Sequence, residues 1–213
     1  MLAVMMIMTL LGGLTVPALK GLTTSNSLST GASKFAGLLN LARSEAIARH
    51  TVVRLVIAQS WSGQTDANQR KMSLWAWDNE LEHYLQFSAW ETLPTGVIVE
   101  SQLPDYIQGA AYAQADASSV RGDNIFDSQF AASDTFDAST PDESITTRYV
   151  EFSPAGTARV PGGTARQAIF VATQGYQNPD GSLVYTDRVG VRPANWAQVN
   201  VDTLTGRVRV YQP

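Results

Sequence analysis

Residues 38–57 read LLNLARSEAIARHTVVRLVI, and the chain changes from helix-forming to strand-forming sequence inside this stretch. The part up to Arg49 is rich in Leu, Ala, Arg and Glu, which favour a helix. Arg43 and Arg49 lie in its last turns, where the helix dipole favours cations. From Thr51 the residues TVVRLVI are mostly β-branched, which is typical of a strand. The sequence therefore predicts that a helix ends close to His50 and that a strand follows at once.

Upstream of this point, apolar residues recur every three or four positions, which is the period of a helix with one buried stripe. The stripe consists of Leu28, Ala32, Phe35, Leu39, Ala42 and Ala46. It continues through residues 23–33, although these are small and polar and have poor helix propensity. We therefore expect one helix over about residues 1–50, roughly 75 Å long at about 1.5 Å per residue. Its half at residues 23–50 is amphipathic and is expected to pack on the rest of the chain.

The first 19 residues, MLAVMMIMTLLGGLTVPAL, carry no charge. This length is about what a helix needs to cross a hydrocarbon layer of ~30 Å. Gly12, Gly13 and Pro17 weaken a soluble helix, but a membrane span tolerates them. The alternatives are a cleaved secretory signal, which usually begins with a basic region, and a buried core helix, which is rarely apolar all round in a small domain. Residues 1–22 are therefore expected to span a membrane.

After residue 50 the sequence predicts an antiparallel β head over residues 51–213. Short alternating stretches are separated by turn sequences such as LPTG (93–96), SPAG (153–156) and TLTG (203–206). The expected strands cover residues 51–58, 70–77, 83–90, 97–100, 148–152, 167–173, 195–202 and 207–211. No helical pattern interrupts the later strands, which argues against a parallel α/β sheet. The predicted fold class is α+β, with a long N-terminal helix and an antiparallel β head.

Residues 101–147 interrupt this head with a long, irregular and acidic stretch. Residues 100–147 hold nine acidic residues against Arg121 alone. A structureless loop of this length is uncommon in a compact domain, so we interpret it as an insertion. Its carboxylates are ligands of the kind that Ca²⁺ takes, and the candidates are Asp123, Asp127, Asp134, Asp137, Asp142 and Glu143. Their spacing matches no EF-hand, and a solvated acidic surface is the simpler interpretation.

The composition argues against several classes of catalytic site. The chain has 213 residues, no cysteine and two histidines, His50 and His83. The absence of cysteine removes disulfides, thiolate catalysis and cysteine-ligated metal centres. No G-x-S-x-G, H-E-x-x-H or P-loop motif occurs. The sequence therefore predicts neither an enzyme nor a cofactor. A membrane-anchored hydrolase would need two carboxylates in one pocket, and the sequence offers no such pair.

The uncharged start, Pro17, the Ser/Thr-rich stretch and residues 38–57 together resemble the amino-terminal half of a type IV pilin-like protein. The resemblance is strongest to minor pseudopilins of the GspH/FimT type and to the prepilin-like Verru_Chthon cassette protein D group. Its most specific part is LARSEAIARH (41–50), followed directly by a β-branched strand. In addition, YVEFSPAGTAR (149–159) and VNVDTLTGRVRV (199–210) resemble the closing strands of the pseudopilin head.

The resemblance implies a structural subunit of a type IV pilus-like or type II secretion filament. Such a subunit is anchored in the inner membrane by its apolar helix, with the head in the periplasm, until it enters the filament. The implied partners are other pilin-like subunits, a prepilin peptidase, an assembly platform and membrane lipid. Gly12, Gly13 and Pro17 would then serve helix packing and the kink of the helix. Because such prepilins carry a basic leader and an early glutamate, we expect the leader and the first few mature residues to precede Met1.

Gly206-Arg207-Val208-Arg209 places two arginines on one face of a strand, because side chains alternate along it. Guanidinium groups suit phosphates, and in FimT-like minor pilins a carboxy-terminal Gly-Arg-X-Arg motif is linked to DNA binding. A DNA-binding minor pilin is therefore one alternative, although a net charge of −4 argues against general binding of nucleic acid. An ordinary solvent-exposed strand face also explains the arginines. The other alternative is a secreted β-sandwich binding module that uses residues 1–19 as a cleaved signal.

Overall fold

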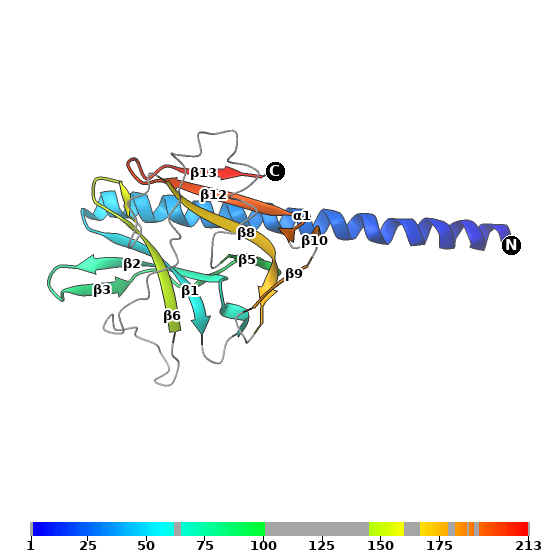
Figure 1. The fold of residues 1–213 in the computed structure, drawn as a ribbon, viewed down its shortest axis with the longest axis horizontal. Coiled ribbons are helices and arrows are strands. Elements are labelled where there is room, and N and C mark those ends of the chain that lie inside the picture. Colours follow the sequence, from blue (N-terminus) through cyan, green and yellow to red (C-terminus); the bar gives the residue numbers. More distant parts are fainter. Residues whose placement is uncertain are drawn as a thin grey trace.

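The chain forms one long helix and a β head that packs on the second half of this helix (Figure 1). The computed structural model describes residues 2–61, 65–100, 145–159, 167–178, 182–186, 188–189 and 192–212, with helix side chains described from Asn26 onward. The N-terminal half of the helix projects beyond the head. The predicted α+β class, a long helix followed by antiparallel β structure, is confirmed.

Helix α1 runs without interruption from Leu2 to Arg49, as the sequence predicts. Its backbone remains helical through Gly12, Gly13 and Pro17. The packing and kinking roles of these three residues stay predictions, because their side chains lie outside the described part of the helix.

The helix ends where the sequence predicts it. His50 has a left-handed φ of 52°, and its backbone N–H donates to the carbonyl oxygen of Ile47 at 3.4 Å. A left-handed residue directly after the last turn is a common way to end a helix. The hydroxyl of Thr51 then donates to the carbonyl oxygen of Trp77 at 2.9 Å, which ties the start of the first strand to its neighbour.

The first sheet is antiparallel and has the strand order β3-β2-β1-β6-β7, with β4 paired to the other end of β2. Its strands are β1 (Val53–Trp61), β2 (Lys71–Asp78), β3 (His83–Gln86), β4 (Glu91–Thr92), β6 (Ile145–Phe152) and β7 (Ala158–Arg159). A short 3-10 helix, Thr65–Ala67, precedes β2.

The second sheet is also antiparallel and has the order β13-β12-β8-β5, with β9 paired to the end of β8. Its strands are β5 (Val97–Val99), β8 (Gln167–Gln177), β9 (Leu183–Tyr185), β12 (Trp196–Asp202) and β13 (Val208–Tyr211). Two further short strands, β10 (Arg188–Val189) and β11 (Arg192–Pro193), pair with each other. Each expected strand range therefore contains a strand.

One hydrophobic core joins the helix to both sheets. All members of the predicted helix stripe are buried, namely Leu28, Ala32, Phe35, Leu39, Ala42 and Ala46. The ring of Phe35 meets Phe170 of β8 edge to face, with 4.9 Å between the ring centroids. Alternate residues of β1, such as Leu55, face the same core. At Gly31 the helix lies so close to β5 that an added Cβ would be 2.8 Å from Val97 Cγ1.

The predicted acidic insertion falls mostly outside the described residues. The description stops at Glu100, after β5, and resumes at Ile145, where β6 begins. The last residues of the range 101–147 therefore belong to a strand and not to the insertion, because β6 pairs with β1 along this whole length. The calcium candidates Asp123, Asp127, Asp134 and Asp137 all lie outside the described residues.

Replacing Phe35 by alanine should lower the free energy of unfolding by about 3–5 kcal/mol, because it removes a fully buried ring and leaves a cavity. The measurement is denaturant unfolding of the full chain in detergent. Leu41→Ala is the control, since Leu41 lies on the same helix but is 44% exposed, and it should change the free energy by less than about 0.5 kcal/mol. Equal losses in the two variants would contradict the assignment of the buried face.

Candidate functional site

Arg43 of α1 connects the helix to a turn of the first sheet. Its Nε donates to the carbonyl oxygen of Gly156 at 3.1 Å, in the turn between β6 and β7. The turn between β12 and β13 of the second sheet lies against the same place, since a Cβ added at Gly206 would be 2.9 Å from Arg43 Cδ and Nε. The two sheets also meet here directly, because Ala158 N–H donates to the carbonyl oxygen of Thr203 at 2.9 Å.

Both of these turns depend on glycine. Gly156 and Gly206 have φ values of 77° and 62°, in the left-handed region that side chains with a Cβ disfavour. A Cβ at Gly206 would also overlap the carbonyl oxygen of Gly156. The sequence predicts both turns from SPAG and TLTG, but it does not predict that Arg43 lies between them. The Arg43–Gly156 bond joins residues 113 positions apart, and no local pattern indicates such a contact.

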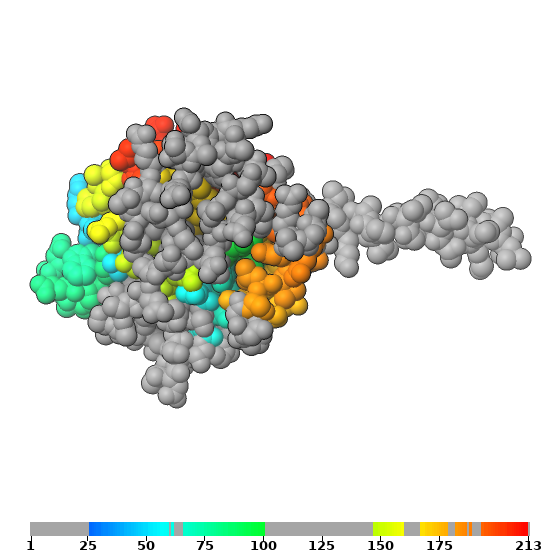
Figure 2. Space-filling view, in the orientation of Figure 1, coloured from blue at the N-terminus to red at the C-terminus, as the bar shows by residue number. Residues whose placement is uncertain are grey.

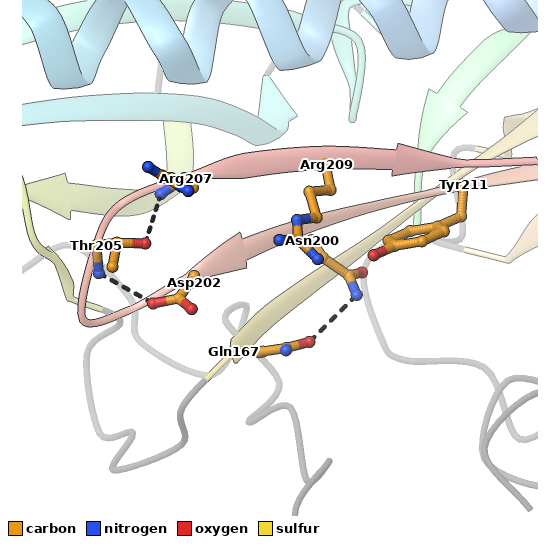
Figure 3. A pocket seen from close by; sticks show the side chains of 7 residues that line it. All are labelled: Gln167, Asn200, Asp202, Thr205, Arg207, Arg209 and Tyr211. Atoms are coloured by element: carbon orange, nitrogen blue, oxygen red, sulfur yellow. Dashed lines mark hydrogen bonds between the residues drawn. The ribbon is translucent and has the colours of Figure 1, made fainter. Parts of the chain in front are cut away.

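The outer face of the β12–β13 hairpin carries the arginines that the sequence singles out. Arg207, Arg209 and Tyr211 line one shallow pocket of about 150 Å³, so the prediction that both arginines share a face of the strand agrees with the structure. Figure 3 shows Arg209 and Tyr211 extending from β13 toward Asn200, with Arg207 beside the turn. Both guanidinium groups belong to exposed residues, so they are accessible to a ligand.

The rest of the pocket wall is polar and already internally bonded. Asn200 Nδ2 donates to Gln167 Oε1 at 3.3 Å, and Gln198 Nε2 donates to Asn200 Oδ1 at 2.7 Å. Asp202 accepts the backbone N–H groups of Leu204 and Thr205 at 3.0 and 2.9 Å, which fixes the turn below Arg207. The pocket therefore offers two cations and one aromatic ring beside hydrogen-bonded amides and the carboxylate of Asp202.

Arg54, on the outer face of the first sheet, is enclosed by two tyrosine rings and a carboxylate. The guanidinium carbon of Arg54 lies 3.6 Å from the ring centroid of Tyr84 and 4.0 Å from that of Tyr149. Its Nε donates to Glu151 Oε2 at 3.1 Å, and the Tyr84 hydroxyl donates to the same oxygen at 3.2 Å. Burial raises the pKa of Tyr84 above its ordinary value, while the charge of Arg54 opposes this shift. The cluster stabilises the sheet and leaves the arginine little access to a ligand.

The remaining candidates do not form a chemical site. His50 is exposed at the end of α1, and His83 Nδ1 lies 2.8 Å from the carbonyl oxygen of Leu81. Among the residues that the structure describes, no three His, Asp or Glu side chains lie close enough together to hold a metal ion. Within the part of α1 whose side chains are described, from Asn26 on, no segment is long and apolar enough to cross a membrane.

Gly206→Ala should lower the free energy of unfolding by at least about 1–2 kcal/mol, because alanine is strained in the left-handed region and its methyl would displace Arg43 or the Gly156 carbonyl. Gly37→Ala is the matched control. A Cβ at Gly37 meets no atom within 4 Å, so this variant should gain about 0.5–1 kcal/mol of stability. Denaturant unfolding measures both, and a Gly206→Ala protein as stable as the parent would contradict the close approach of the two turns.

A sequence profile of the family described as type II transport protein GspH matches residues 31–206. No curated protein sequence matches the chain. Solved structures that align with it include two of the minor pseudopilin EpsH from the type 2 secretion system of Vibrio cholerae, with identities of 11% and 13% and TM-scores of 0.44. They cover 88% and 89% of this chain, and 98% and 96% of the EpsH chains. The type IV minor pilin FimU of Pseudomonas aeruginosa is 13% identical, with a TM-score of 0.43 over 88% of this chain and 93% of that chain.

The profile match runs from Gly31, where α1 meets β5, to Gly206, where the last hairpin turns, and it therefore spans more than half of the chain. It includes the buried half of the helix, both sheets and the two turns that hold Arg43. The chain belongs to the GspH family of type II transport proteins and is a pilin-like structural subunit.

Proposed function

We propose that this subunit builds a type II secretion or type IV pilus-like filament, and that residues 1–22 hold it in the inner membrane before assembly. The head then lies in the periplasm, or outside the cell once the filament extends. Family membership and the uncharged residues 1–19 support this proposal. The partners are neighbouring pilin-like subunits, a prepilin peptidase and an inner-membrane assembly platform.

The observation that carries the proposal is the outward face of α1. Every exposed residue of the helix between positions 26 and 48 is uncharged, and these residues are Asn26, Thr30, Ser33, Gly37, Asn40, Leu41, Ser44, Ile47 and Ala48. A helix face that stays in water normally carries charged residues. The small residues among them, such as Gly37 and Ser44, allow the backbones of two helices to approach closely. This face is therefore suited to contact with helices of neighbouring subunits.

The charged residues of this half of the helix are directed elsewhere. Lys34 Nζ forms an ion pair with Glu91 at 2.7 Å and donates to the carbonyl oxygen of Thr92 at 2.9 Å, both in β4. Arg43 reaches Gly156 in the head. Glu45 pairs with Arg49 of the same helix at 2.7 Å. The outward face between positions 26 and 48 therefore remains neutral.

Gly37 is the most informative position on the outward face. Glycine in a helix interior costs about 1 kcal/mol relative to alanine. The head does not require glycine there, because a Cβ at this position has no neighbour within 4 Å. Close approach of a second helix explains why glycine occurs at this position, whereas no contact within the isolated subunit does.

Gly37→Lys and Ser44→Lys should prevent incorporation of the subunit into the filament, because each places a charge in the proposed helix–helix contact. The measurement is the amount of subunit in sheared filaments or in crosslinked assemblies from cells. Asn79→Lys, in the exposed turn between β2 and β3, adds the same charge away from α1 and should assemble normally. Folding is checked by denaturant unfolding, and normal assembly of both helix variants would contradict the proposal.

A second function is favoured by the β13 pocket. Arg207 and Arg209 present two cations beside the ring of Tyr211, and guanidinium groups suit the phosphates of a nucleic-acid backbone. A subunit with this pocket would bind DNA during uptake. Asp202, on the pocket wall, limits the net positive charge that the pocket offers.

Changing both Arg207 and Arg209 to alanine should weaken binding of a short DNA duplex by the full chain. Because each neutralised phosphate contributes about 0.9 to the slope of log affinity against log salt, the slope should fall by about two. Arg159→Ala, an exposed arginine of β7, is the control and should leave the slope unchanged. DNA binding with the same salt slope in the double variant would rule out this pocket as the DNA site.

A further inference from the structure

We propose that one end of the head rests on the phospholipid headgroup layer while the subunit is anchored in the membrane. This end carries what we name the proximal surface, which consists of Tyr176, Leu183, Val184 and Arg188. The inference rests on the membrane anchor in the proposed function and adds a second contact with the lipid, made by the head itself.

The proximal surface lies at the end of the head that faces the N-terminal half of α1. In Figure 1, β9 and β10 lie at the end from which this half of the helix projects, and Figure 2 shows the same segment in orange at that end. Among the helix side chains described from Asn26 on, Leu28 is the first that is buried against the head. It follows Lys20, the first charge of the chain, by eight residues. Eight helical residues span about 12 Å.

This spacing brings the head close to the lipid. The headgroup layer on each side of a bilayer is about 5–8 Å thick. If the hydrocarbon ends near Lys20, about 5 Å along the helix separates the headgroups from Leu28. This distance is less than the Debye length of about 8 Å. A helix tilt of about 20° brings one edge of the head into contact.

The strand pairing explains why apolar residues are exposed here. The pairing of β8 with β12 and β5 ends at Gln174, and the next residues, Gly175–Gln177, pair with β9. Gly175 N–H also donates to the carbonyl oxygen of Gly96 at 2.9 Å. All three residues of β9, Leu183–Tyr185, are half-buried, whereas the central residues of β12 are fully buried. Tyr176 is 56% exposed. The β8–β9 hairpin therefore shows apolar side chains to its surroundings from both faces.

The chemistry of these side chains suits a lipid interface. Tyrosine is enriched at headgroup level because its ring is apolar and its hydroxyl is polar. The exposed guanidinium group of Arg188 lies 5.6 Å from the ring centroid of Tyr185, and guanidinium groups form paired hydrogen bonds with phosphate. Glu100 is 3% exposed and bonded to Tyr185, so its charge is turned away from the surface. The other acids of this segment, Asp180 and Asp187, lie outside the described residues.

The opposite end of the head has a different character. Leu81, which is 57% exposed in the turn between β2 and β3, lies between the exposed acids Glu80 and Glu82. An anionic lipid surface repels such a turn. Exposed apolar residues alone do not distinguish the two ends, but among the described side chains an arginine accompanies them at the proximal surface and two acids accompany them at this turn.

Absence of cysteine from the chain permits a direct test. A fluorophore is attached to Thr186→Cys, beside the proximal surface, or to Asn79→Cys at the opposite end, since both parent residues are exposed. The full chain is reconstituted into phosphatidylethanolamine and phosphatidylglycerol vesicles that contain headgroup-spin-labelled lipid in both leaflets. We expect quenching at position 186 to exceed quenching at position 79 several-fold. Adding Tyr176→Ser and Arg188→Glu should reduce it to the level at position 79, whereas Arg159→Glu should not.

Vesicle flotation separates the two levels of the proposal. A chain that floats with the vesicles but shows equal quenching at both positions would overturn the headgroup contact and leave the membrane anchor intact. Unchanged quenching after the double substitution would overturn the assignment to Tyr176 and Arg188. A chain that does not float would overturn the anchor and the headgroup contact together.

Discussion

The burial of one face of α1 between two β-sheets is the contact on which the rest of the structure depends. Phe35 and Leu39 are fully buried at its centre, and Phe35 meets Phe170 from the second sheet. The inner faces of both sheets and the buried face of the helix form one hydrophobic cluster, so the helix is part of the core of each sheet. Arg43 reinforces this contact at the end of the helix, where it binds the Gly156 turn and lies against the Gly206 turn.

The same burial determines what the helix offers to other molecules. Once one face is buried against the head, the flanking residues Lys34 and Arg43 bond to the head as well. The face that remains is neutral, and the chain upstream of it leads to the uncharged residues 1–19. One helix can therefore hold the head, contact neighbouring subunits and enter an apolar environment, because each task uses a different face or a different half.

Much of this architecture could be predicted from local sequence patterns. The stripe from Leu28 to Ala46 and the strand at Thr51 follow from periodicity, and strand alternation places Arg207 and Arg209 on one face. Contacts between distant segments could not be predicted in this way. The position of Arg43 between two glycine turns, the addition of Tyr211 and Gln167 to the arginine pocket, and the pairing of β9 with the end of β8 all depend on which strands lie side by side. Composition and period do not contain this information.

Cysteine crosslinking along α1 in assembling cells tests the central claim most directly. Single cysteines are placed at each position from 26 to 48 of a chain that has none of its own, and crosslinks to neighbouring subunits are measured. The account predicts crosslinking that rises and falls with the helical period of about 3.6 residues, with maxima at the exposed positions around Gly37 and Ser44. Crosslinking without this period, or none at any exposed position, would contradict a helix that is shared between its own head and its neighbours.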